Sequence, residues 1–140
     1  MREDPQLIAD GLDEFLRFDP PLIGLARRAT RDVEVGGQLI RKGDAVYYSI
    51  AAANRDPEEF DDPDAFDPTR VKNRHLAFSG GIHRCVGSNL AKVMLKVSLE
   101  QLLLRLDDIT IDGEVEYIQA AARGMKTCPI RFTAREHAPA

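Results

Sequence analysis

A long apolar segment at residues 87–107 constrains the fold most. Its apolar side chains fall on more than one face of a helix, which is typical of a helix packed against neighbours on several sides. They are Leu90, Val93, Met94, Leu95, Val97, Leu99, Leu102, Leu103, Leu104 and Leu106. Such a helix would be about 30 Å long. Its charged residues, among them Lys92, Lys96, Glu100 and Arg105, make it unsuited to a membrane span. We therefore expect a long, buried helix in a globular protein.

The ten residues before this helix, FSGGIHRCVG at 78–87, contain a cysteine between spaced glycines. On an extended segment, residues two apart point to the same side, so His83 and Cys85 would face one ligand. Gly81 and Gly87 would let a flat ligand approach the backbone. Since Cys85 directly precedes the predicted helix, backbone N–H groups and the helix dipole would favour its thiolate. A thiolate is a ligand for iron or zinc.

Cys85 also has other interpretations. A free cysteine is usually a small buried hydrophobic residue. Zinc is disfavoured, because His75 is the single extra ligand candidate nearby. Nucleophilic catalysis lacks an obvious base, since His83 is too close in sequence. A disulfide between Cys85 and Cys128 stays open at this point.

A second pattern lies near the start of the chain. Ile8, Leu12 and Phe15 mark one apolar helix face, and two prolines at 20 and 21 end that helix. Glu14 and Arg17 on it are three residues apart. Taken alone, this spacing indicates an exposed ion pair that contributes at most a few tenths of a kcal/mol to stability.

Strands and turns occupy much of the remaining chain. Residues 32–35 and 38–40 flank Gly36-Gly37, a two-residue hairpin signal. Residues 45–50, 109–111 and 130–132 read as further strands. The acidic stretch at 54–67 is interrupted by prolines and lacks the pattern of a calcium-binding loop, so we interpret it as a solvated loop.

The motif Phe-x-x-Gly-x-His-x-Cys-x-Gly, matched at Phe78, Gly81, His83, Cys85 and Gly87, resembles the haem-binding signature of the cytochrome P-450 superfamily. The resemblance, to the bacterial soluble type, implies an α+β fold that corresponds to the C-terminal part of the family's fold. Its parts would be a Glu-x-x-Arg helix (1–19), a β-rich region (22–50), a meander (51–77), the cysteine loop (78–87), the long helix (87–107) and C-terminal strands (108–135).

The resemblance also implies roles around the cofactor, which would be haem b. Cys85 would be the axial thiolate ligand of the haem iron. His83 would contact one haem propionate and Arg27 another, with Arg28 as a shifted alternative. Phe78, Gly81 and Gly87 would line the site. Ser79 stands where bacterial members usually carry glycine, and we expect little effect.

Two further sets of residues follow from the resemblance. Glu14 and Arg17 would form a buried structural network with Arg70, from the segment Phe66-Asp67-Pro68-Thr69-Arg70. Residues 22–25 and 121–125 would form two walls of a substrate pocket.

The implied activity is that of a haem-thiolate monooxygenase acting on a small organic substrate, with a ferredoxin or flavoprotein as electron donor. The 140 residues correspond to about the last third of a family member and lack the oxygen-activating half. We therefore expect activity only with a missing N-terminal portion. The alternatives are a non-catalytic haem-binding module and a structural remnant without cofactor.

Charge and hydropathy limit the remaining partners. A net charge of −4, with no basic stripe, disfavours nucleic acid. No membrane span or signal peptide is apparent, which makes a cytoplasmic location the expectation. Lys92, Lys96 and Arg84 are a candidate basic patch for an acidic electron-transfer partner.

Overall fold

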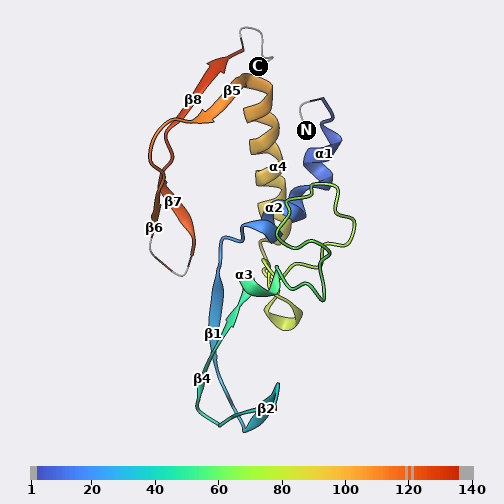
Figure 1. Ribbon diagram of the computed structural model, residues 1–140, viewed down its shortest axis with the longest axis vertical. Helices are drawn as coiled ribbons and strands as arrows, with labels where there is room; N and C mark the ends of the chain where they lie inside the picture. Colours follow the sequence, from blue (N-terminus) through green and yellow to red (C-terminus); the bar gives the residue numbers. More distant parts are fainter. Residues whose placement is uncertain (1–2, 119, 121, 136–140) are drawn as a thin grey trace.

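The computed structural model describes residues 3–118, 120 and 122–135 and combines helices with small antiparallel sheets (Figure 1). The helices are α1 (Gln6–Asp10), α2 (Leu12–Phe18), α3 (Ile50–Ala53) and α4 (Ser88–Arg105), and a 3-10 turn, η1, covers Gly81–His83. This arrangement confirms the α+β class.

The described strands form four two-stranded antiparallel sheets. β1 (Gly24–Arg28) pairs with β4 (Ala45–Ser49), and β2 (Val33–Val35) pairs with β3 (Gln38–Ile40). β5 (Leu106–Ile111) pairs with β8 (Ile130–Ala134), and β6 (Glu116–Ile118) pairs with β7 (Gly124–Thr127). In Figure 1, β1 to β4 extend away from the helices at one end, and β5 to β8 form an arm beside α4.

The glycine pair predicted the hairpin between β2 and β3. Gly36 has a φ of 55° and Gly37 a φ of 77°. Positive φ at both central residues is the geometry of a type I′ turn, which matches the twist of the flanking strands. The short strands therefore pair in the register Val33 with Ile40 and Val35 with Gln38.

The N-terminal segment is two helices, where the sequence predicted one over residues 1–19. Gly11 separates α1 from α2, and its N–H donates to the Leu7 carbonyl at 3.0 Å. A Cβ at this position would lie 3.0 Å from Pro68 Cβ. The break therefore lies where the loop containing Pro68 packs directly against the backbone.

The core is small and lies where α1, α2 and α3 meet the loop that follows α3. Its buried apolar side chains are Ile8, Leu12, Ile50 and Phe60. The buried polar ones are Glu14, Arg17, Asn54 and Ser88. Ionic and hydrogen-bonded groups thus make up as much of this core as apolar groups do.

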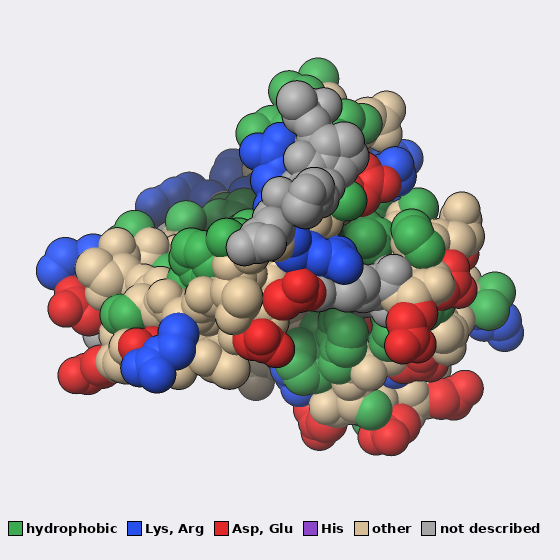
Figure 2. Space-filling model, turned by 90° about the horizontal axis from the view of Figure 1, so that it is seen from above, with side chains coloured by type: hydrophobic (Ala, Val, Ile, Leu, Met, Phe, Trp, Pro, Cys, Tyr) green, Lys and Arg blue, Asp and Glu red, His purple; other side chains and the backbone are tan. Residues whose placement is uncertain are grey.

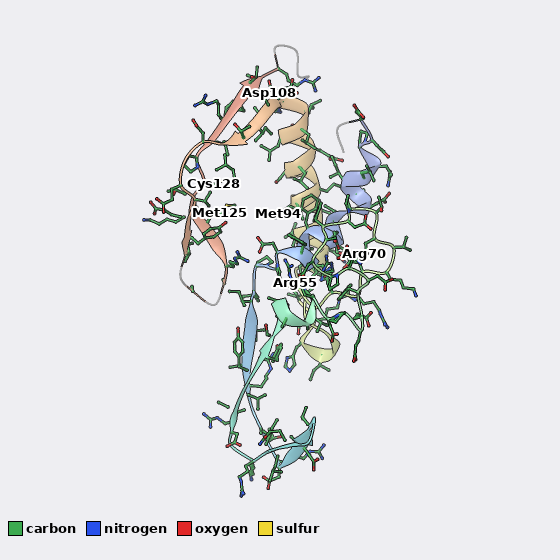
Figure 3. All side chains as sticks on the ribbon, in the orientation of Figure 1. Arg55, Arg70, Met94, Asp108, Met125 and Cys128 are labelled. Atoms are coloured by element: carbon green, nitrogen blue, oxygen red, sulfur yellow. The ribbon has the colours of Figure 1, made fainter. Side chains whose placement is uncertain are left out.

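The long helix has nearly the expected position, but its expected burial is wrong for this chain. Leu90, Val93 and Met94 are 64%, 57% and 61% exposed. The apolar side chains occupy more faces than α1, α2 and β5, its neighbours in the fold, can cover. Figure 2 shows hydrophobic side chains at the surface, and Figure 3 locates Met94 on α4. Among the described helices, none is long and apolar enough to cross a membrane.

Candidate functional site

The cysteine loop is closed by a backbone hydrogen bond across it. The Cys85 N–H donates to the Phe78 carbonyl oxygen at 2.9 Å. Between them, Gly81 adopts a φ of 58°, which favours glycine. The Ser88 N–H donates to the Cys85 carbonyl at 3.3 Å, so the loop leads directly into α4. Both ends of the loop are therefore fixed by main-chain contacts.

His83 does not lie on an extended segment. It ends the turn η1, and its N–H donates to the Gly80 carbonyl at 3.3 Å. The extended geometry predicted for His83 and Cys85 is therefore wrong, because the glycines fold the chain into a 3-10 turn. Both side chains are exposed.

The surroundings of the Cys85 thiol are apolar and open. Ile82 and Val86, three residues before it and one after, are almost fully exposed, and Phe78 is half-buried. Cys85 and Cys128 are both free, so the disulfide left open above is not formed. In the described part of the chain, no group of three or more His, Cys, Asp or Glu side chains could hold a metal ion. A single thiol among exposed apolar side chains fits a metal whose other ligands belong to a flat organic cofactor.

The two candidate arginines on β1 are held differently. Arg28 donates to the Gly43 carbonyl at 2.6 Å. The Arg27 guanidinium lies 5.3 Å from the centre of the Tyr48 ring and donates to the Ala26 carbonyl at 2.9 Å. Neighbouring strand residues point to opposite faces. Only one of the two can therefore point toward a ligand on a given face of β1.

The structure brings Glu14, Arg17 and Arg70 together (Figure 3 shows Arg70). Arg17 contacts both oxygens of the Glu14 carboxylate, at 2.7 and 2.8 Å, and Arg70 Nε reaches Glu14 Oε2 at 3.2 Å. Asn73 and the Asp67 N–H also donate to this carboxylate. Burial by itself would raise the pKa of Glu14, but the hydrogen bonds from Arg17 and the Asp67 N–H, together with the two arginine charges, hold it below its ordinary value.

Arg17 uses all five of its N–H groups. Two go to Glu14, and the other three go to the carbonyl oxygens of Asn54, Pro63 and Ala65 at 2.8, 2.7 and 2.9 Å. The side chain is fully buried. Arg17 therefore joins α2 to the end of α3 and to the loop that follows, which makes it a junction of the core.

Sequence reasoning missed Asn54, which is fully buried after α3. Its side-chain amide donates to the Arg17 carbonyl at 3.2 Å, and its Oδ1 accepts from the Leu76 N–H at 2.7 Å. No local signal marks this role, because both partners are distant in sequence. Asn54 thus links α2 to the segment that enters the cysteine loop.

The two proposed substrate walls meet in the structure. Leu22 forms an isolated bridge with Ala122, and the Arg123 N–H donates to the Pro21 carbonyl at 2.5 Å. Arg123 also pairs with Asp19 at 2.6 Å. A cavity of about 140 Å³ lies here, bounded in part by Met125, which Figure 3 labels. Ala121 lies outside the described residues.

The candidate basic patch is weakened by ion pairs. Lys92 Nζ lies 2.6 Å from Asp13 Oδ1, and Lys96 Nζ lies 2.7 Å from Glu100 Oε1. Two of its three cations are therefore paired within the chain.

Comparison with known proteins identifies the family. A model of the family "Cytochrome P450" matches residues 3–122. Cytochrome P450-terp of a Pseudomonas species is 42% identical over 133 residues, which are 94% of this chain and 31% of that protein. Nocardicin C N-oxygenase of Nocardia uniformis subsp. tsuyamanensis is 47% identical over 134 residues, 94% of this chain and 34% of that protein.

A solved structure, cytochrome P450 CYP109Q5 from Chondromyces apiculatus, matches with a TM-score of 0.91 and 38% identity. The match covers 97% of this chain and 36% of that one. The chain belongs to the cytochrome P450 family. It spans about a third of the length of the relatives it matches.

Proposed function

We propose that this chain forms the thiolate side of a haem site in a cytochrome P450 monooxygenase, with Cys85 as the axial ligand of haem b. The observation that carries the proposal is the Cys85 loop, in which a free thiol is held between exposed apolar side chains. Bound haem would supply the iron at which oxygen is activated, and a thiolate ligand favours O–O cleavage.

The chain's own residues would bind and orient the cofactor. Phe78, Ile82 and Val86 would cover its apolar body and exclude water from the thiolate. The hydrogen bond from the Cys85 N–H to the Phe78 carbonyl oxygen holds Cys85 in its loop. Arg27 and His83, both exposed, would pair with the propionates.

Turnover, in this proposal, needs the rest of the P450 fold. Two observations support it. The relatives are about three times longer than the matched region. The apolar side chains of α4 are also exposed here, and surfaces of this kind mark sites of association. The completed protein would oxidise a small organic substrate, bounded in part by residues 22–25 and 122–125, with electrons from a ferredoxin or flavoprotein.

The test is a haem titration of the purified chain, followed by reduction under carbon monoxide and an absorption spectrum. We expect a thiolate-type Soret band, lost in Cys85→Ala and retained in the matched variant Cys128→Ala. A wild-type spectrum without this band would reject the haem-thiolate site. The structural remnant without cofactor would then be the remaining alternative.

A substrate-oxidation assay with a surrogate electron donor separates the remaining alternatives. The chain alone should bind haem without coupled turnover. Regioselective product from the chain alone would contradict the need for the rest of the fold. A polypeptide that supplies the remaining P450 segments can then be added to the haem-bound chain. If no oxidised product forms even in its presence, the chain is better described as a non-catalytic haem-binding module.

A further inference from the structure

His75 lies on the segment that enters the cysteine loop, and the proposed haem site gives it no role. Its side chain is 6% exposed. Its Nε2 lies 3.1 Å from Asp13 Oδ1 on α2, and its ring lies 5.9 Å from that of Phe78, centre to centre. The imidazole thus stands between α2 and the first residue of the loop.

The hydrogen bonds of His75 define its tautomer. The Ala77 N–H donates to Nδ1 at 3.1 Å, and a backbone N–H is always a donor. Nδ1 is therefore unprotonated, and Nε2 carries the proton that is donated to Asp13. A doubly protonated imidazole has no free lone pair at Nδ1, so protonation of His75 would break its contact with Ala77.

The same Asp13 oxygen also contacts α4, which begins after the loop. Lys92 Nζ lies 2.6 Å from Asp13 Oδ1. Burial by itself would raise the pKa of Asp13, but the hydrogen bonds from Lys92 and His75 and the charge of Lys92 lower it below its ordinary value. One ionised carboxylate therefore holds both flanks of the loop, the upstream one through His75 and the downstream one through Lys92.

We propose that Asp13 and His75 act as positioning residues for the Cys85 thiolate, by fixing the entry to its loop while His75 is the neutral Nε2–H form. The inference rests on the proposed haem-thiolate function, to which it adds a pH-dependent support. Four charged groups border the same cavity of about 330 Å³ as His75: Asp13 from α2, Lys92 from α4, and Arg74 and Arg84 from the loops. Arg74 is paired with Glu59 at 2.7 Å.

The first test needs no haem. Nitrogen-15 NMR of the wild-type chain reports the ring tautomer of His75, and amide hydrogen exchange reports the protection of the Cys85 N–H, which is bonded to Phe78. We expect the Nε2–H tautomer in the neutral ring. The protection factor of Cys85 should fall roughly tenfold as His75 becomes protonated, the scale of one lost hydrogen bond.

Variants separate positioning from a general loss of structure. His75→Asn keeps an acceptor near the position of Nδ1 but loses the contact with Asp13 and does not titrate, so the protection factor of Cys85 should not change with pH. In His75→Ala, the protection factor of Cys85 should be about tenfold lower than in the neutral wild type, whatever the pH. Val71→Ala, an exposed change upstream of the loop, is the matched control and should keep the wild-type pH profile. An Nδ1–H tautomer, or equal pH profiles for wild type and His75→Asn, would overturn the inference even if His75→Ala fails to fold.

The haem titration distinguishes this inference from the proposed function. If the wild type shows a thiolate-type Soret band and His75→Ala shows the same band with the same affinity and pH profile, the positioning role fails and the proposed function stands. If no variant binds haem but the exchange results hold, the proposed function fails, and the support of the loop by His75 stands.

Discussion

Replacing Arg17 by lysine tests whether the buried junction around Arg17 is held by geometry or by charge alone. Lysine keeps the positive charge beside Glu14. It offers three N–H groups from one nitrogen, whereas Arg17 donates five from a planar group to one carboxylate and three carbonyl oxygens. At least two of these five acceptor contacts must therefore be lost.

The expected magnitude follows from those two contacts. A buried acceptor left without its partner costs about 1–3 kcal/mol. Because Pro63 and Ala65 are only half-buried, we use the lower half of that range, which gives a loss of about 3 kcal/mol in the free energy of unfolding. With a urea m-value of about 1.5 kcal/mol/M, the midpoint should fall by about 2 M.

Urea unfolding followed by far-ultraviolet circular dichroism measures this shift. Arg131→Lys is the matched control, because Arg131 pairs with Asp112 while the two side chains are 73% and 51% exposed. An exposed pair contributes little, so its midpoint should move by less than about 0.3 M. If Arg17→Lys shifts the midpoint no more than Arg131→Lys, the five-bond junction does not stabilise the core and our reasoning is refuted.

Three further predictions concern single positions. Ser79 has a φ of 57°, so Ser79→Gly should relieve left-handed strain and raise stability by up to about 1 kcal/mol in the same urea assay, and a lower midpoint would contradict this. Gly11→Ala should destabilise the chain, since its Cβ would lie 2.8 Å from the Leu7 carbonyl oxygen, and an unchanged melting temperature would count against the close contact. The lowered pKa of Glu14 supplies stability that is present above the ordinary pKa of 4.5 and lost as pH falls through the folded value. The melting temperature should therefore fall less steeply between pH 6 and pH 3 in Glu14→Gln than in wild type. Parallel falls in the two proteins would exclude Glu14 as a source of the pH-dependent stability.

The sequence predicted the elements whose signals are local. The Gly36-Gly37 pair predicted a hairpin, and the apolar pattern predicted the long helix. The sequence also predicted that Glu14, Arg17 and Arg70 are partners, but through a family resemblance and not through their spacing. The prediction that α4 is buried was wrong, because periodicity shows which faces of a helix are apolar but not what covers them.

Features that depend on distant contacts were out of reach. The break at Gly11 comes from the approach of Pro68, and the role of Asn54 comes from partners on α2 and at Leu76. Ser79 was expected to matter little, but its left-handed backbone makes the residue type consequential. Such effects arise from tertiary geometry, which a one-dimensional pattern does not record.

The four two-stranded sheets have a practical consequence. Within the described residues, β6, β7 and β8 each pair with a single neighbouring strand, so the other edge of each is not paired with a further strand. Exposed edges of this kind are templates for pairing with another chain, and those of β6 and β8 carry the exposed aromatic side chains of Tyr117 and Phe132. At high concentration, the isolated chain should therefore self-associate through strand edges, in competition with any folded partner that covers them.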